Sequence, residues 1–255
     1  MRGYVDTRWG QLHYSSTGAG NRTIVLFHET PLSHGAYQRL APELAESFRV
    51  IVFDTPGYGE SDPPQGITTI EEYAATFLEG IDALGVDRFT VLGAHTGADF
   101  AVELAANGAH DRVDGVVLIG VPFYEEQVRR ARVPAVVPAF RDDGQHLLES
   151  FNRPPKIYDA ELLSRMAGSV CEFPDRAFWA YHSVYAYLPG EALPKISAPV
   201  LFLSHEQDPL YDGDCMGLKI VSDGRQVMVP SERLPLYWTQ PARVAEQVRS
   251  LLGEG

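Results

Sequence analysis

The stretch VLGAHTGADF, residues 91–100, decides the fold and raises the main question about function. A small residue, any residue, a nucleophile, any residue and a second small residue, set between an apolar run and an Ala-rich helix, form the pattern of a nucleophile elbow. Here Gly93 and Gly97 flank His95. An imidazole therefore stands where a Ser, Cys or Asp nucleophile is expected.

Short apolar runs alternate with helical patterns on both sides of this stretch. The alternation predicts an opening hairpin around Trp9-Gly10, followed by a parallel sheet with helices on both faces, which is an α/β fold. Thr69 is expected to cap a helix because Glu72 stands three residues on. Strands are predicted at 23–28, 49–54, 89–93, 113–120, 198–204 and 225–230, and helices at 36–47, 69–85, 97–108 and 240–252.

The alternation breaks off between about Val121 and Leu193, where helical patterns rich in aromatic residues and Arg follow one another. We interpret residues 122–193 as a helical cap inserted into a core made of residues 1–121 and 194–255. Open α/β sheets bind ligands at the carboxyl ends of their strands, so the cap is expected to cover that edge.

Composition limits the partners. The chain of 255 residues carries 34 acidic and 21 basic residues, a formal net charge of -13, which argues against nucleic acid and anionic membranes. Cys171 and Cys215 are too few for a disulfide framework, and no metal-ligand spacing joins them to histidines. No apolar stretch has the length of a signal peptide or a membrane helix. We expect a cytoplasmic monomer or homodimer that acts on a small-molecule substrate without cofactor or metal.

Three further motifs, together with the elbow, carry a resemblance. LFHETP (26–31), FDTPGYGESD (53–62), the elbow, and LSHEQDP (203–209) stand in the order and at the places of the matching motifs of the α/β-hydrolase superfamily, which this chain resembles over nearly its whole length. HETP, HTGA and DDGQHL are similar to a bacterial branch whose elbow reads His-Thr-Gly. The resemblance implies the α/β-hydrolase fold, a mostly parallel sheet with an inserted cap.

The triad implied by this resemblance is incomplete. Asp208 matches the acid and His95 the nucleophile, but the position of the relay histidine, seven residues before Pro241, holds Leu234, and VPSERLPLYWTQP contains no histidine. We predict that the triad has become a His95–Asp208 dyad. In it Asp208 holds one ring nitrogen, and the other faces the substrate as a general base. The alternatives are that His95 plugs a disused elbow and that Asp208 only forms a turn beside Pro209.

The oxyanion hole is expected to survive. By the resemblance its two backbone N–H donors are those of Thr30 and Thr96, and His28 before them has a mainly architectural role. Two such donors stabilise an alkoxide, an enolate or a tetrahedral oxyanion. Glu29 replaces the usual Gly, so its carboxylate is placed either beside the pocket or outward in solvent.

Other residues are expected to line the substrate pocket. They are Phe123 and His146 in the cap region and Leu234, Tyr237 and Trp238 after the last strand. A single histidine on a helical segment, such as His146, is more often structural or exposed. The aromatic residues Tyr237 and Trp238 are equally compatible with the core.

Two classes of function remain. The first is a cofactor-free enzyme of the α/β-hydrolase fold that uses His95 and Asp208 on a small, largely apolar carbonyl compound, by hydrolysis, lysis or cyclisation. The second is a catalytically silent binder or receptor for a small molecule. Leu234 favours the binder, whereas a titratable His95 directed at an oxyanion hole favours the enzyme.

Overall fold

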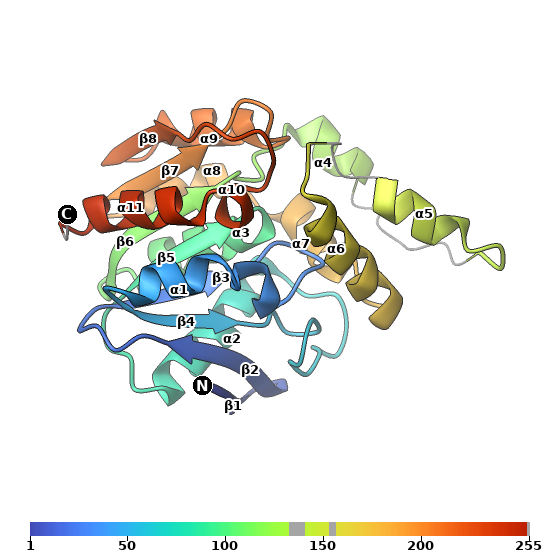
Figure 1. Ribbon diagram of the computed structural model, residues 1–255, viewed down its shortest axis with the longest axis horizontal. Coiled ribbons are helices and arrows are strands. Elements are labelled where there is room, and N and C mark those ends of the chain that lie inside the picture. Colours follow the sequence, from blue (N-terminus) through green and yellow to red (C-terminus); the bar gives the residue numbers. More distant parts are fainter. Residues whose placement is uncertain (133–140, 153–156, 254–255) are drawn as a thin grey trace.

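The computed structural model describes residues 1–132, 141–152 and 157–253. Its centre is an eight-stranded sheet in the order β1-β2-β4-β3-β5-β6-β7-β8, shown in Figure 1. The strands are β1 (Arg2–Thr7), β2 (Gly10–Thr17), β3 (Thr23–Phe27), β4 (Arg49–Phe53), β5 (Phe89–Ala94), β6 (Val113–Ile119), β7 (Val200–Ser204) and β8 (Gly224–Met228). The pair β1–β2 and the pair β2–β4 are antiparallel, and the other neighbours are parallel. The α/β-hydrolase fold expected from the sequence is confirmed.

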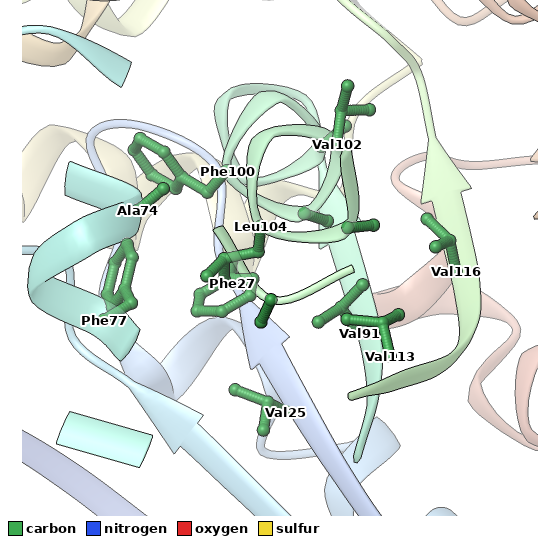
Figure 2. Packing of buried hydrophobic residues seen from close by; sticks show 14 of the residues in the cluster. Val25, Phe27, Ala74, Phe77, Val91, Phe100, Val102, Leu104, Val113 and Val116 are labelled. Carbon is green, nitrogen blue, oxygen red and sulfur yellow. The ribbon is translucent and has the colours of Figure 1, made fainter. Parts of the chain in front are cut away.

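Helices cover both faces of the sheet. Strand β3 shows why, because Val25 and Phe27 contribute to one hydrophobic cluster while Ile24 and Leu26 contribute to the other. Figure 2 shows the first cluster, in which side chains of β3, β5 and β6 meet those of α2 (Ile70–Ala83) and α3 (Thr96–Glu103). A strand buried on both faces reads as one continuous apolar run, which is the pattern seen in the sequence. The opposite face packs against α1 (Leu40–Ala45) and α11 (Pro241–Leu251).

Helix α2 begins as expected. The Thr69 side chain accepts a hydrogen bond from the Glu72 backbone N–H, and the Glu72 side chain accepts one from the Thr69 backbone. This reciprocal capping satisfies two donors that the first helical turn leaves free.

The predicted helix over 36–47 is divided in two. A short 3-10 helix, η1 (His34–Tyr37), precedes α1, which begins only at Leu40. Pro42 explains the break, because proline lacks a backbone N–H and is tolerated only in the first turn of a helix. Further along the chain, α3 continues into a π-helical turn, η2 (Leu104–Gly108).

The segment predicted as a cap is helical where it is described. It contains α4 (Glu126–Arg132), α5 (Gln145–Asn152), α6 (Ala160–Glu172), α7 (Trp179–Ala186), α8 (Pro189–Ala192) and the 3-10 helix η4 (Leu193–Lys195). In Figure 1, α4 to α7 lie together at one end of the molecule, beyond the tip of β4. The carboxyl ends of the parallel strands face this end, so these helices stand where ligands bind in open α/β sheets. The domain boundaries at 122 and 193 stay a prediction.

Two short helices follow the last strands. Helix α9 (Tyr211–Leu218) lies between β7 and β8, and α10 (Leu236–Thr239) lies directly before α11. The sequence pattern did not predict either, because α9 has no apolar period and α10 is a single turn. None of the described helices is long and apolar enough to cross a bilayer.

Candidate active site

The elbow is built as a sharp turn from β5 into α3. His95 has φ 50° and ψ -116°, and it is the only residue other than glycine with positive φ in the described ranges. Its flanking glycines are required by close backbone approach. A Cβ at Gly97 would lie 2.0 Å from the Phe27 carbonyl oxygen, and one at Gly93 would lie 2.0 Å from the Gly97 carbonyl oxygen. A backbone of this kind costs about 1–3 kcal/mol and is found mostly at functional sites.

The imidazole of His95 lies between two carboxylates. Its Nε2 is 3.1 Å from both carboxylate oxygens of Asp208, and its Nδ1 is 3.0 Å from Oε2 of Glu29. The predicted contact with Asp208 is confirmed. The prediction that the second ring nitrogen is free to face the substrate is wrong, because Glu29 turns inward and occupies it. Both carboxylates are buried, and 13% of the His95 side chain is exposed.

The polar chain continues beyond Glu29. The hydroxyl of Tyr237 donates a hydrogen bond to Oε1 of Glu29, and Tyr237 is fully buried. The chain of contacts is therefore Tyr237, Glu29, His95 and Asp208. Leu234, at the place of the missing relay histidine, is buried in the hydrophobic core beside Tyr158, with which it forms an isolated β-bridge.

The charges of this cluster depend on one another. Burial alone would lower the pKa of His95, but the negative charges and hydrogen bonds of Asp208 and Glu29 raise this pKa well above its ordinary value. Burial would raise the pKa of Asp208, and the His95 charge lowers it instead. Opposite charges at this distance favour the ionised forms of both partners. The two carboxylates accordingly favour the protonated form of His95.

Thr96 follows His95 in the chain, and Thr30 follows Glu29, whose carboxylate contacts His95. Thr30 and Thr96 are both buried, and the backbone N–H of neither donates a hydrogen bond within the described part of the chain. Thr96 is the first residue of α3, where an N–H has no partner inside the helix. These are the two donors that the sequence predicted for an oxyanion hole, and that role stays a prediction.

The loop that carries Thr30 is held by His28. Nδ1 of His28 is 3.0 Å from the Glu29 carbonyl oxygen, and Nε2 accepts a hydrogen bond from the Thr55 backbone N–H. Burial lowers the pKa of His28, so the ring is neutral and carries its proton on Nδ1. The contacts of His28 are thus with the backbone of its own loop and its neighbour, in agreement with an architectural role.

Two residues behind the cluster were not found by sequence reasoning. A Cβ at Gly120 (φ +70°) would lie 2.6 Å from Cδ2 of His95, so this position must be glycine for the imidazole to fit. Asp214 accepts hydrogen bonds from the backbone N–H groups of Gly120 and Val121 and from the Ser204 hydroxyl. Burial raises the pKa of Asp214 to about 7. No motif marks either residue, because their role depends on how β6 and β7 end side by side.

An aromatic side chain from residues 122–193 contacts the loop that carries Thr30. The hydroxyl of Tyr181 on α7 donates to the Thr30 carbonyl oxygen at 2.9 Å. Its ring is stacked between those of Phe178 and Tyr185. Tyr158, which sequence reasoning also missed, is buried, and burial together with the nearby charges of Glu29 and Asp208 raises its pKa.

The remaining predicted pocket residues have other roles or lie outside the described residues. Phe123 packs against Gly190 of α8 and Gly213 of α9. Trp238 is fully buried, donates from Nε1 to Asp159 and lies under the guanidinium of Arg39, so it belongs to the core. His146 lies on α5, and its side chain falls outside the described part of the structure.

Comparisons with known proteins agree with this fold and identify proteins that are similar in sequence or structure. The family model described as "alpha/beta hydrolase fold" matches residues 22–151, half of the chain. A 2-hydroxy-6-oxononadienedioate/2-hydroxy-6-oxononatrienedioate hydrolase of Pseudomonas putida is 36% identical over 115 residues, 43% of this chain and 40% of that protein. Haloalkane dehalogenase 2 of Mycobacterium bovis is 34% identical over 116 residues, 45% of this chain and 40% of that protein.

The chain thus spans about two fifths of the length of these curated relatives. The solved structure of an enol-lactonase from Burkholderia xenovorans LB400 superposes with a TM-score of 0.81 at 22% identity, over 99% of this chain and all of that one. At that identity the likeness shows the fold alone. From the family match and the shared architecture it follows that this chain belongs to the α/β-hydrolase fold family.

Proposed function

We propose that this protein is an enzyme that transfers protons to and from a small carbonyl compound by means of the buried unit Glu29–His95–Asp208. The observation that carries this proposal is the position of His95, between two carboxylates at 3.0 and 3.1 Å and on the strained turn of the elbow. Burying three charges costs several kcal/mol unless they are paired. Groups with strongly shifted pKa values in such surroundings are candidates for acid–base chemistry.

The charge state sets the role of His95. We predicted a general base, but an imidazolium at neutral pH has no lone pair to accept a proton, so His95 acts as the proton donor of the unit. Asp208 stays bound at Nε2 and stabilises the cation. Glu29, which is within hydrogen-bond distance of Nδ1, exchanges that proton with the ring and passes it on. The unit therefore holds one mobile proton, which moves between Nδ1 of His95 and the carboxylate of Glu29.

The oxyanion donors complete the proposed mechanism. A carbonyl oxygen held by the N–H groups of Thr30 and Thr96 gains negative charge as its carbon is attacked or as a neighbouring bond breaks. Preorganised donors of this kind typically contribute about 10²–10³-fold to the rate. In hydrolysis, water attacks the carbonyl carbon, and the Nδ1 proton of His95 passes through Glu29 to the leaving group as its bond to carbon breaks. The proton that the water loses returns through Glu29 to His95, so the unit ends with the protons with which it began.

The relatives suggest which carbonyl compounds to try. The names of two of them refer to a 6-oxo dienedioate and an enol lactone. Both are carbonyl compounds in which cleavage releases or passes through an enol. We infer that this substrate class suits a site with a proton donor and an oxyanion hole and without a serine nucleophile.

The decisive variant is His95→Asn. Asparagine tolerates positive φ and keeps a donor amide, but it cannot carry a proton. We expect turnover of enol lactones or 2-hydroxy-6-oxo dienoates, followed by absorbance and mass spectrometry, to fall by about 10²–10⁴-fold. In the wild type, kcat should decrease as pH rises through the raised pKa of His95, because the donor loses its proton.

Matched controls separate the site from general damage. Glu206 is exposed two residues before Asp208. Glu206→Gln should leave turnover unchanged, while Asp208→Asn should lower it. Thermal unfolding of each variant checks the fold. Turnover of His95→Asn at the wild-type rate, with the fold intact, would refute the proposal.

The lack of a serine at the elbow gives a second test. Fluorophosphonate probes and activated esters report a nucleophilic hydroxyl. We expect no labelled peptide over residues 93–97 and no burst of acyl-enzyme. The same reagents on an ordinary serine esterase serve as the positive control. Stoichiometric labelling at the elbow would show a nucleophilic hydroxyl there and contradict the proposed mechanism.

A receptor is the second candidate function. It is favoured by the occupation of both ring nitrogens of His95, together with Leu234 at the place of the relay histidine. A receptor would return its ligand chemically unchanged, and His95→Asn would alter affinity rather than rate. Recovery of a tightly bound metabolite without conversion at any pH would favour this candidate over the enzyme.

A further inference from the structure

A second group of histidines and carboxylates lies away from the elbow, where β2, η1 and the loop after β4 meet. His13 on β2, His34 at the start of η1 and Glu60 present side-chain atoms that all lie within 4.8 Å of one another. Within the described ranges, this is the one group of three His, Cys, Asp or Glu side chains that could hold a metal ion. The mechanism proposed above uses none of them.

Asp54 fixes both imidazoles from behind. One of its oxygens is 2.8 Å from Nδ1 of His13, and both are within 3.1 Å of Nδ1 of His34. Asp54 also accepts hydrogen bonds from the backbone N–H groups of His34 and Glu60. The two oxygens of Asp54 thus both act as hydrogen-bond acceptors.

The tautomers follow from these contacts. Because the Asp54 oxygens accept hydrogen bonds from backbone N–H groups, they act as acceptors toward both rings, so the Nδ1–H of each ring points at Asp54 and the lone pair of a neutral ring lies on Nε2. This is the arrangement in which a carboxylate orients the histidine ligands of a metal. In His13 that lone pair has no partner, since Nε2 is buried and makes no hydrogen bond. The nearest carboxylate oxygen is Oε1 of Glu60, at 4.0 Å.

We propose that His13, His34 and Glu60 form a binding site for a divalent transition metal, zinc being the best match, with Asp54 orienting both histidines. A buried acceptor without a partner is costly, and a metal ion at Nε2 of His13 would satisfy it. Two imidazoles and one carboxylate are a common zinc ligand set, with a fourth position left for water. Calcium and magnesium are disfavoured because they require oxygen ligands.

The geometry allows the ligands to close around an ion. Tetrahedral zinc bonds of 2.0–2.1 Å bring ligand atoms to about 3.4 Å from one another. Glu60 can supply the required movement because its side chain is 46% exposed, while His13 is held in the sheet. Tyr4 donates to the other oxygen, Oε2 of Glu60, and so leaves Oε1 for the metal.

Arg2 is the competing cation. Its guanidinium lies 3.8 Å from Oε1 of Glu60, and its side chain is 69% exposed. An ion pair between such exposed side chains is weak, so a metal ion displaces it readily. Arg2→Ala should therefore keep or slightly tighten zinc affinity.

The test uses untagged protein stripped with a chelator and titrated with Zn²⁺ alone, by calorimetry and elemental analysis. We expect one zinc per chain and a rise in Tm with zinc concentration, since an ion that binds only the folded state stabilises it. His34→Ala and Glu60→Gln, both at partly exposed positions, should fold and should each weaken zinc affinity by at least about tenfold. Co²⁺ should show the visible absorption of a tetrahedral site.

Two further variants show where zinc binds. His110 is an exposed histidine paired with Asp111, so His110→Ala should leave affinity unchanged. His95→Asn should also retain zinc, because His95 is not part of this site. The proposal is overturned if His34→Ala and Glu60→Gln bind zinc as tightly as the wild type, or if zinc uptake is lost in His95→Asn instead.

Discussion

The two histidine clusters of this molecule are built in opposite ways. At the elbow one imidazole, His95, lies between two carboxylates, and in the second cluster one carboxylate, Asp54, lies between two imidazoles. The same residue types therefore produce different chemistry. Two carboxylates occupy both nitrogens of His95 and keep it protonated. Asp54 contacts only Nδ1 of each ring and leaves Nε2 of both rings for another ligand.

The difference teaches that the ratio of carboxylates to imidazoles decides what a buried histidine can do. An imidazolium with two counter-charges can give a proton but cannot bind a metal ion, since its lone pair is used. Neutral imidazoles oriented by a shared carboxylate are suited to bind a metal ion. Substitutions within or directly behind each cluster should test this difference.

The largest effect on stability is expected from Asp54→Asn. Asp54 is fully buried and accepts hydrogen bonds from two ring nitrogens and two backbone N–H groups, whereas an amide can accept through only one atom. Removing one partner of a buried charged network costs about 3–5 kcal/mol. Urea unfolding measures this loss, with the exposed Asp142→Asn as control. A loss below about 1 kcal/mol, well under that range, would contradict the role of Asp54 as the centre of the second cluster.

A smaller effect is expected from Gly120→Ala, which disturbs the elbow cluster. Gly120 and Gly85 both have positive φ, but a Cβ at Gly85 would meet nothing within 4 Å, while one at Gly120 would strike the ring of His95. Gly85→Ala should therefore cost only the backbone strain of about 1–2 kcal/mol. Gly120→Ala should cost about 1–3 kcal/mol more, as overpacking does, and should reduce turnover. Equal stabilities of the two variants would show that His95 is not held as described.

The third prediction concerns the pH dependence of stability behind the elbow. The pKa of Asp214 is raised from its ordinary value near 3.8 to about 7, so between these values the folded state binds more protons than the unfolded state. Stability from this group is fully present below about pH 4 and is lost as pH rises toward 7, with a slope of up to about 1.4 kcal/mol per pH unit.

Asp214→Asn should remove this slope, although its single amide oxygen can replace only one of the two oxygens that accept from Val121 on one side and from Gly120 and Ser204 on the other. Unfolding midpoints of wild type and variant across that pH range provide the measurement. Parallel curves would mean that Asp214 titrates as an ordinary carboxyl.

The sequence predicted the fold and the central pair of the elbow cluster for specific reasons. The elbow and the acid loop each fix a residue at the end of a strand, so these two motifs are sufficient to place His95 and Asp208 near one another. The oxyanion role of Thr30 and Thr96 was inferred from such motifs too, and it stays a prediction. In each case the position depends on local backbone geometry, which short motifs encode well.

The rest depends on tertiary contacts that no motif encodes. Whether Glu29 points inward depends on the path of the loop after β3 and on Tyr237, far along the chain. Because sequence reasoning left Glu29 open, it assigned His95 the role of a base, whereas the second carboxylate raises the pKa of His95 and favours the role of a proton donor proposed here. His13, His34 and Glu60 likewise come from separate elements without a regular spacing, so their approach is visible only in the folded chain.

The central claim is that His95 is an imidazolium held by Glu29 and Asp208. Nitrogen NMR of protein with isotopically labelled histidine reads the protonation of each ring nitrogen directly, and His95→Asn identifies the resonances. We predict that both nitrogens of His95 are protonated at neutral pH and that the ring loses a proton only well above the ordinary histidine pKa. Glu29→Gln and Asp208→Asn should each lower that pKa. A neutral His95 ring at neutral pH, with one unprotonated nitrogen, would contradict the account.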